Sequence, residues 1–262
     1  MKNYKYIETT KTLNSRINFN NKFGNFNLLN FINKKFKIKI GQKVLDLGCG
    51  DGRYCELFLK KIKSSGHLIA LDKNSELVNN LKKKDKIKKK NFSIKKIDFD
   101  TKWGISTKID WFFSIYSIQY TKNFQNLLKK IIKISKHNTK LVFIGPGKEN
   151  SKQLNELHYL IFNKRPATLY VDRMKFIETI VLKILKKNLK NKKILITKHN
   201  YKIKFPSSIS YAEYYWSTPV WTDIAVKLSK KEILSKKKKT LDIIKNKNFR
   251  VLKKQSVCIY CR

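Results

Sequence analysis

The chain has 262 residues, of which 41% are hydrophobic, and its formal net charge at pH 7 is +42. This length supports one large α/β domain with a sizeable core, or a domain with a small cap. The sequence contains no run of ~18 apolar residues, and residues 1–10 lack the apolar core of a signal peptide. We therefore expect a cytoplasmic protein without a membrane span.

The positive charge has two interpretations, a nucleic-acid partner or the imprint of an AT-rich coding sequence. The basic residues are mostly lysine, alanine is scarce, and the lysines are spread along the whole chain. This pattern favours the second interpretation, so a nucleic-acid partner is possible but not favoured. A positive field steers anionic substrates toward the protein in either case.

Residues 1–40 form a polar, asparagine-rich lead with two predicted helices. The string Thr12–Phe19 begins one of them, and the other covers Asn25–Phe36, where apolar residues approach helical spacing. Next come a predicted strand, Lys43–Leu47, and glycines at alternate positions 48, 50 and 52. An amphipathic run, Arg53–Lys63, predicts a helix directly after the glycines.

A strand, a glycine turn and a helix in this order make a ligand site in a doubly wound sheet. Glycine has no Cβ, so the backbone can take positive φ and a ligand can approach closely. Dinucleotide enzymes use G-x-G-x-x-G to bind a pyrophosphate, which Asp46 would repel here. A carboxylate at this position suits a ligand that carries an ammonium group. The alternative is a structural glycine turn without a ligand.

The string VLDLGCGDG, Val44–Gly52, resembles the first motif of the class I S-adenosylmethionine-dependent methyltransferases at every position. Strand and helix then alternate, so we expect right-handed crossovers and parallel strands. The predicted strands are His67–Asp72, Phe92–Asp98, Asp110–Tyr116 and Lys140–Ile144, and the predicted helices are Ser75–Lys84 and Asn123–Ser135.

Residues 148–222 are expected to form the substrate side, and the residues after them to complete the core. The predicted helices are Glu149–Phe162, Asp172–Leu189, Tyr211–Trp216 and a basic helix at 223–247, and the predicted strands are Ile194–Phe205 and Phe249–Cys261. Aromatic residues are densest around Tyr211, Tyr215 and Trp216. They either wall a substrate pocket or pack the cap onto the sheet.

The resemblance implies an α/β fold with a doubly wound, Rossmann-like sheet of about seven strands, mostly parallel with an antiparallel last strand. Residues 1–40 would form an N-terminal helical lid and 41–147 the cofactor-binding core. Residues 148–222, including strand 6, would form a cap inserted after strand 5, and 223–262 would complete the core. Of the cysteines, Cys258 and Cys261 form a single C-x-x-C, whereas zinc requires four ligands, so we predict no metal site.

The resemblance also implies S-adenosylmethionine as the cofactor. Asp72 would bind the ribose hydroxyls, with a helix N-cap as its alternative role, and Asp98 would bind the adenine amino group, with Asp100 as its competitor. Arg16 would pair with the cofactor carboxylate, unless it is a solvated arginine on a helix face. The other expected cofactor-binding residues are Asp46, Gly48, Cys49, Gly50, Gly52, Lys73, Phe99, Ser114 and Ile115.

The sulfonium is already activated, so the protein would mainly align donor and acceptor for in-line displacement. His158 and Tyr116 are the candidate catalytic residues. Tyr116, Gln119 and Tyr120 follow strand 4 and should face the transferred methyl. The candidate substrate-binding residues are Tyr120, Tyr211, Tyr215 and Trp216.

We predict methyl transfer to an oxygen or nitrogen atom of a small molecule. The alternatives are an RNA methyltransferase, because of the charge, and a basic binding protein with a degenerate methyltransferase fold. The segment after strand 4 has neither an Asn/Asp-Pro-Pro-Tyr turn nor a cysteine nucleophile, which weakens two nucleic-acid interpretations. The acceptor, the base and the oligomeric state stay open.

Overall fold

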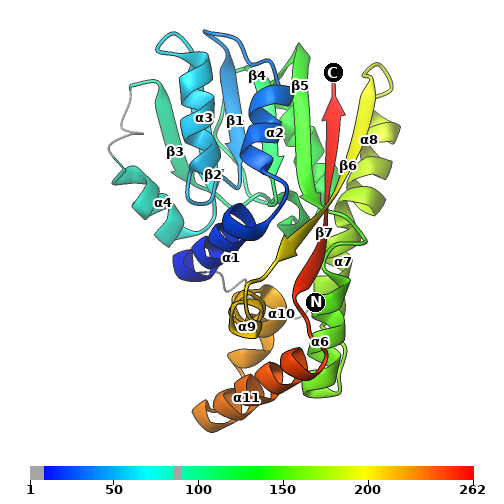
Figure 1. Cartoon of the computed structure of the whole chain (residues 1–262). Coiled ribbons are helices and arrows are strands. Elements are labelled where there is room, and N and C mark those ends of the chain that lie inside the picture. Colours follow the sequence, from blue (N-terminus) through cyan, green and yellow to red (C-terminus); the bar gives the residue numbers. More distant parts are fainter. Residues whose placement is uncertain (1–8, 85–89) are drawn as a thin grey trace. The chain divides into compact units, whose positions relative to one another are not determined.

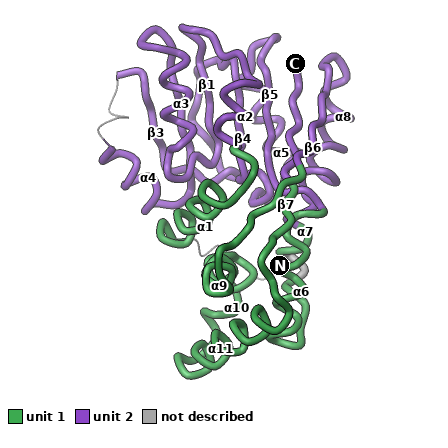
Figure 2. The backbone as a smooth tube through the Cα atoms, in the orientation of Figure 1, with its two compact units in different colours: residues 1–27, 149–172, 200–255 green, residues 28–148, 173–199, 256–262 purple. Residues whose placement is uncertain are grey.

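The computed structural model describes residues 9–84 and 90–262, which form two compact units. Unit 1 combines the described residues up to 27 with 149–172 and 200–255, and unit 2 combines 28–148, 173–199 and 256–262 (Figure 2). Each unit therefore brings together segments that are far apart in the sequence. The predicted domain ranges stay a prediction.

The sheet has seven strands in the order β3-β2-β1-β4-β5-β7-β6 (Figure 1). Their bounds are β1 Lys43–Leu47, β2 His67–Asp72, β3 Phe92–Lys96, β4 Ile109–Ile115, β5 Ser135–Pro146, β6 Ile194–Lys204 and β7 Val251–Cys261. The first five strands pair in parallel, and β7 runs antiparallel to β5. This confirms the predicted fold class, a Rossmann-like sheet with an antiparallel last strand.

Helices cover both faces of the sheet in unit 2. They are α2 Leu28–Lys35, α3 Arg53–Ile62, α4 Ser75–Lys82, the 3-10 turn η2 Ile118–Tyr120, α5 Phe124–Ile134, the π-helical η3 Ile177–Val181 and α8 Leu182–Asn188. One apolar cluster joins β1 and β4 to α5 and α8, and the other joins them to α2 and α3. The central strands are thus buried on both faces, which explains their continuous apolar runs.

Most predicted helices and strands begin and end within about three residues of the predicted positions, and three elements differ by more or are divided. β5 begins earlier than predicted, at Ser135, and the helix expected at 172–189 begins at Thr168 as α7 (Thr168–Phe176). The basic helix expected at 223–247 is two helices, α10 Pro219–Ala225 and α11 Lys230–Asn246. Ser229 and Glu232 form a capping box that starts α11 anew.

Unit 1 is mainly helical and has an aromatic interior. Besides α10 and α11 it contains α1 Thr10–Phe23, α6 Lys152–Phe162, α9 Ser208–Trp216 and the start of α7. Tyr211, Tyr214 and Tyr215 are essentially fully buried. The ring of Tyr211 lies 4.9 Å from Phe205, and that of Tyr215 lies 5.7 Å from Trp221, measured between centroids. These contacts make α9 a core element of the unit.

The lysine run at 236–239 in α11 packs against its own unit. Lys239 Nζ donates to the carbonyl of Ile161 at 3.0 Å, and Lys236 Nζ reaches the same carbonyl at 3.5 Å. Lys237 Nζ lies 4.8 Å from the ring centroid of Trp216. Ammonium groups at the C-terminal end of α6 donate to a carbonyl that has no partner within the helix, and they interact favourably with the negative end of the helix dipole. Three of these four lysines therefore have structural contacts.

Cys258 and Cys261 lie on opposite faces of β7. Cys258 belongs to the apolar cluster with α2 and α3, and Cys261 to the cluster with α5 and α8. Residues three apart on a strand point in opposite directions, so the pair does not converge on one ligand. Within residues 9–84 and 90–262, no helix is both long and apolar enough to cross a membrane.

Candidate functional site

The glycine turn joins β1 to α3 at the carboxyl end of the parallel strands. All three of its glycines have positive φ: +77° at Gly48, +56° at Gly50 and +79° at Gly52. The N–H groups of Gly48 and Cys49 both donate to the Leu71 carbonyl of β2, at 2.6 and 3.1 Å. The turn is therefore fixed to the neighbouring strand, and its glycines are required by its backbone.

Gly48 also allows close packing against the segment after β4. A Cβ at this position would lie 2.2 Å from Ser117 Cβ. Ser117 Oγ donates to the Leu47 carbonyl at 2.6 Å and lies 2.6 Å from Ser114 Oγ. Ser114 and Ser117 are both buried. The predicted residue Ser114 is thereby brought beside the turn.

Asp46 is a buried carboxylate without a cationic partner in the described chain. It is 1% exposed, and its Oδ2 accepts a hydrogen bond from Cys55 Sγ at 3.7 Å. Its Oδ1 has no hydrogen-bond partner among the described residues. Burial raises the pKa of Asp46 to about 7, with further contributions from the carboxylates of Asp72 and Asp51. A ligand ammonium group beside Asp46 would reverse this effect.

Asp72 ends β2 and reaches back to the turn. Its Oδ2 accepts from the Gly50 N–H and its Oδ1 from the Asn74 N–H, both at 2.9 Å. Burial raises its pKa, and these backbone donors oppose the rise. Asn74, and not Asp72, is the N-cap of α4, so the N-cap alternative for Asp72 is wrong. Each carboxylate oxygen keeps a further lone pair for a ligand hydroxyl.

The two aspartates after β3 have different roles in the structure. Asp100 accepts from the Thr121 hydroxyl at 2.7 Å and from the Lys122 N–H at 2.9 Å. The side-chain carboxylate of Asp98 accepts one hydrogen bond among the residues the structure describes, from the Asp100 N–H to Oδ1 at 3.0 Å. Asp100 therefore fixes the loop to the segment after β4. Asp98 keeps one carboxylate oxygen available for a ligand.

A second polar group without a partner lies after β4. Tyr116 has φ +54°, and its N–H donates to the Ile144 carbonyl of β5 at 2.6 Å. Gln119 is 7% exposed and donates from Nε2 to the Tyr116 carbonyl at 3.0 Å. Its Oε1 has no partner in the described part of the chain, and a Cβ on Gly145 would lie 3.6 Å from it. Gln119 and Gly145 thus face each other at the ends of β4 and β5.

Sequence reasoning did not find two further contacts of the turn. Arg53 forms a two-point ion pair with Asp51, with Nη2 2.6 Å from Oδ2 and Nε 3.0 Å from Oδ1. Burial opposes ionisation of Asp51, but the Arg53 guanidinium lowers its pKa. Cys55 is the donor to Asp46. The sequence signal for this contact was the position of Cys55, one helical turn after Gly52.

A family model described as "Methyltransferase domain" matches residues 38–169, about half of the chain. The chain belongs to this family. With the Rossmann-like sheet and the glycine turn, the match identifies an S-adenosylmethionine-dependent methyltransferase. No curated protein matches the sequence significantly.

Solved structures share the methyltransferase fold at low sequence identity. A SAM-dependent methyltransferase from Aquifex aeolicus is 20% identical with a TM-score of 0.53, covering 72% of this chain and 91% of its own. The YcgJ protein of Bacillus subtilis is 14% identical with a TM-score of 0.59, over 89% and 96%. Coclaurine N-methyltransferase, bound to N-methylheliamine and SAH, is 14% identical with a TM-score of 0.50, over 90% and 71%. At these identities the likeness shows the fold alone.

The remaining predicted cofactor-binding residues of this methyltransferase divide between the units. Phe99 is buried, and its Cζ lies 3.1 Å from the position of a Cβ on Gly48. Ile115 is buried at the end of β4, and Lys73 follows Asp72. Arg16 lies in unit 1, where its guanidinium donates to the Ser217 carbonyl. Its pairing with the cofactor carboxylate stays a prediction.

Other predicted catalytic and substrate residues of the methyltransferase also lie in unit 1. His158 is 3% exposed, its Nδ1 lies 3.0 Å from the Tyr215 hydroxyl, and burial lowers its pKa to about 4. The imidazole is therefore neutral at neutral pH. Tyr211 and Tyr215 are buried among aromatic rings, whereas Trp216 is partly exposed. In unit 2, the Arg173 guanidinium lies 4.7 Å from the ring centroid of Tyr120. Their roles stay predictions.

Proposed function

We propose that this methyltransferase holds its cofactor through the Gly48–Gly52 turn and three carboxylates, and methylates an oxygen or nitrogen atom of a small molecule. The observation that carries the cofactor assignment is the buried Asp46 Oδ1 without a partner in the described chain. A ligand ammonium would supply the missing charge at this position. The raised pKa of Asp46 has the same cause, since burial without a cation destabilises the ionised form.

The other two carboxylates fit the rest of the same ligand. Asp72 is held by backbone donors at the end of β2, where its oxygens can accept from two ribose hydroxyls. Asp98 keeps a carboxylate oxygen for the adenine amino group. The Asp100 carboxylate, by contrast, already accepts hydrogen bonds from the Thr121 hydroxyl and the Lys122 N–H. Cys49, Lys73, Phe99, Ser114 and Ile115 complete the proposed set.

When bound, S-adenosylmethionine supplies a methyl group on a sulfonium, already activated for displacement. The chain's own contribution on the acceptor side is Gln119. Its Oε1 is buried, and Gly145 opposite it carries no side chain. An acceptor N–H or O–H would donate to this oxygen, which would orient the nucleophilic atom. N–H and O–H groups are carried by nitrogen and oxygen atoms. This contact therefore favours a nitrogen or oxygen atom of the substrate as the atom that is methylated.

A small-molecule acceptor is supported over RNA by what the lysines contact. In unit 2, Lys130 Nζ donates to the carbonyls of Phe99 and Thr101, and Lys192 Nζ to those of His137 and Thr139. In unit 1, the run at 236–239 makes comparable contacts with Ile161 and Trp216. Lysines whose ammonium groups donate to backbone carbonyls contribute less to a phosphate-binding surface than lysines whose ammonium groups face solvent.

The test is a methyl-transfer assay with tritiated S-adenosylmethionine and an extract of the source organism. The extract is divided into a fraction below ~1 kDa, a protein fraction and an RNA fraction, and an Asp46→Ala variant serves as the blank. We expect label in the small-molecule fraction, unaffected by prior ribonuclease treatment. Label that enters the RNA fraction and is lost with ribonuclease would assign the enzyme to the RNA alternative. Cofactor binding without transfer to any fraction would support the binding-protein alternative.

A further inference from the structure

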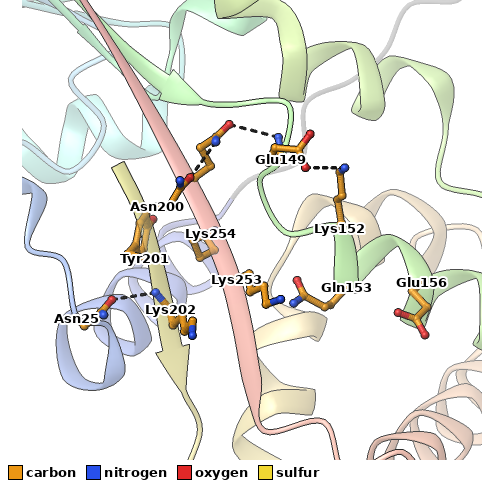
Figure 3. A pocket seen from close by; sticks show the side chains of 11 residues that line it. Asn25, Glu149, Lys152, Gln153, Glu156, Asn200, Tyr201, Lys202, Lys253 and Lys254 are labelled. Atoms are coloured by element: carbon orange, nitrogen blue, oxygen red, sulfur yellow. Dashed lines mark hydrogen bonds and ion pairs between the residues drawn. The ribbon is translucent and has the colours of Figure 1, made fainter. Parts of the chain in front are cut away.

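Unit 1 contains a groove with a volume of about 630 Å³. It is lined by Asn25, by Glu149 before α6, by the first part of α6, by the end of β6 and by the start of β7 (Figure 3). All of these residues belong to unit 1, and none of them is part of the proposed cofactor site. A groove of this size accommodates one small molecule.

The groove has an excess of positive charge, because four lysines line it against two carboxylates, those of Glu149 and Glu156. Lys152 is neutralised by Glu149, with 2.6 Å between Nζ and Oε2. Neither Lys202 nor Lys253 forms an ion pair within residues 9–84 and 90–262, and Figure 3 shows Lys253 with its ammonium end toward Gln153. Lys254 Nζ donates to the Tyr214 hydroxyl at 3.0 Å. A concave surface with unpaired ammonium groups concentrates anions.

The floor of the groove is a fixed network of amides. Gln255 is 6% exposed and donates from Nε2 to Asn200 Oδ1 at 2.9 Å. Its own N–H donates to Asn150 Oδ1 at 3.1 Å. At the far side, the Lys202 N–H donates to Asn25 Oδ1 at 2.8 Å. Amides held in this way can donate to and accept from hydroxyl groups without further ordering.

An aromatic ring completes the lining. Tyr201 lies beside Lys202 on β6, and its ring centroid is 5.3 Å from that of Phe26. A ring that is held by a second ring offers a flat apolar surface next to polar groups. Together with the amides and ammonium groups, it matches a ligand that has a ring with hydroxyls and an anionic end.

We propose that this groove binds a phosphorylated sugar. Lys202 and Lys253 would hold the phosphate, and the amides of Asn200 and Gln255 would bind hydroxyls. The face of the sugar ring would lie against Tyr201. This site is separate from the methyl-transfer proposal, since it shares no residue with it.

The experiment is calorimetric titration of the full chain at constant ionic strength with glucose 6-phosphate, glucose, inorganic phosphate and a ten-nucleotide RNA. The test variant is Lys202→Gln/Lys253→Gln. The matched control is Lys230→Gln/Lys238→Gln, which removes two exposed lysines of α11 in the same unit and the same net charge. We expect glucose 6-phosphate to bind the wild type, the test variant to bind it at least ~10-fold more weakly, and the control to change less than ~2-fold.

The binding of the separate parts tests the sugar assignment. Tyr201→Ala should weaken binding of glucose 6-phosphate but not of inorganic phosphate. Three outcomes would overturn the proposal. These are no binding of glucose 6-phosphate, equal losses in the test and control variants, and RNA binding that depends on Lys202 and Lys253 and falls steeply with salt. Thermal unfolding of each variant establishes that a loss of binding is not a loss of fold.

Discussion

At the residue scale, Asp46 links cofactor binding to pH. Its carboxylate must ionise to pair with a ligand ammonium, but burial keeps its pKa at about 7 in the free protein. Affinity for S-adenosylhomocysteine should therefore rise about tenfold between pH 6 and pH 8, as the proton is lost. Calorimetric titration with S-adenosylhomocysteine across this pH range measures the change in affinity. Asp46→Asn should bind weakly at all pH values, and a pH profile equal to that of the wild type would contradict the assignment.

The same residue should affect stability. Because the folded pKa is raised above the unfolded value of 3.8, the folded protein loses stability as pH rises from about 4 to 7. The full penalty above pH 7 is of order 4 kcal/mol. Asp46→Asn should thus be more stable than the wild type at pH 8 and equal to it near pH 4. Urea unfolding at the two pH values measures the difference.

Gln119 is the residue that should distinguish acceptor binding from cofactor binding. Gln119→Leu removes the Oε1 acceptor and the Nε2 donor to Tyr116 while keeping similar volume. We expect turnover to fall about 10- to 100-fold, which corresponds to one lost hydrogen bond to a reacting group, with unchanged affinity for S-adenosylhomocysteine. Equal loss of cofactor affinity would show that Gln119 supports the turn and does not orient the acceptor.

At the element scale, the β1–α3 turn depends on close packing as well as on positive φ. Gly48→Ala would place a Cβ 2.2 Å from Ser117 Cβ, at φ +77°. Gly104 is a matched control, since it has φ +59° and a Cβ added there would meet nothing within 4 Å. Strain and overpacking together should cost Gly48→Ala ~2–5 kcal/mol in unfolding free energy, against ~1–2 kcal/mol for Gly104→Ala. Similar costs in denaturant unfolding would exclude the packing role.

The lysine run at 236–239 of α11 should also affect the unfolding free energy, through its contact with α6. Lys239→Met removes the 3.0 Å hydrogen bond to the Ile161 carbonyl at the end of α6, whereas Lys238 is exposed and makes no such bond. Lys239→Met should lower the unfolding free energy by ~0.5–1 kcal/mol, and Lys238→Met should leave it nearly unchanged. Thermal unfolding at low and high salt measures both. Identical effects would mean that the run contributes only net charge.

For the whole molecule, binding of S-adenosylhomocysteine should protect one set of amides from hydrogen exchange. The proposed site places the affected segments in unit 2, at Leu47–Gly52, at Asp72–Asn74 and after β4. At a concentration of 100 times Kd, the ligand should raise global stability by about 2.7 kcal/mol. Protection at Arg16 as well would support its predicted pairing with the cofactor carboxylate. Protection absent from the glycine turn would contradict the proposed site.

The sequence by itself determined the β1–turn–α3 unit, because its signals are local. Val44–Leu47 is continuous apolar sequence apart from Asp46, the glycines supply the positive φ values, and Asp46 and Asp72 stand at fixed distances from them. The alternation of strands and amphipathic helices likewise predicted the parallel strands, and the resemblance predicted the antiparallel last strand. These features depend on neighbours in sequence, so chain order alone reveals them.

Only the tertiary structure decided which polar groups have partners. Asp98 and Asp100 compete for one role in the sequence, and the structure separates them, because the Thr121 hydroxyl and the Lys122 N–H donate to the Asp100 carboxylate. The aromatic run in α9 has the composition of a pocket wall, yet Tyr211 and Tyr215 pack as core. Contacts between residues far apart in sequence cannot be read from local patterns, since they depend on how the strands and helices pack. The same packing directs the lysines at 236 and 239 to a carbonyl of α6, which no charge count predicts.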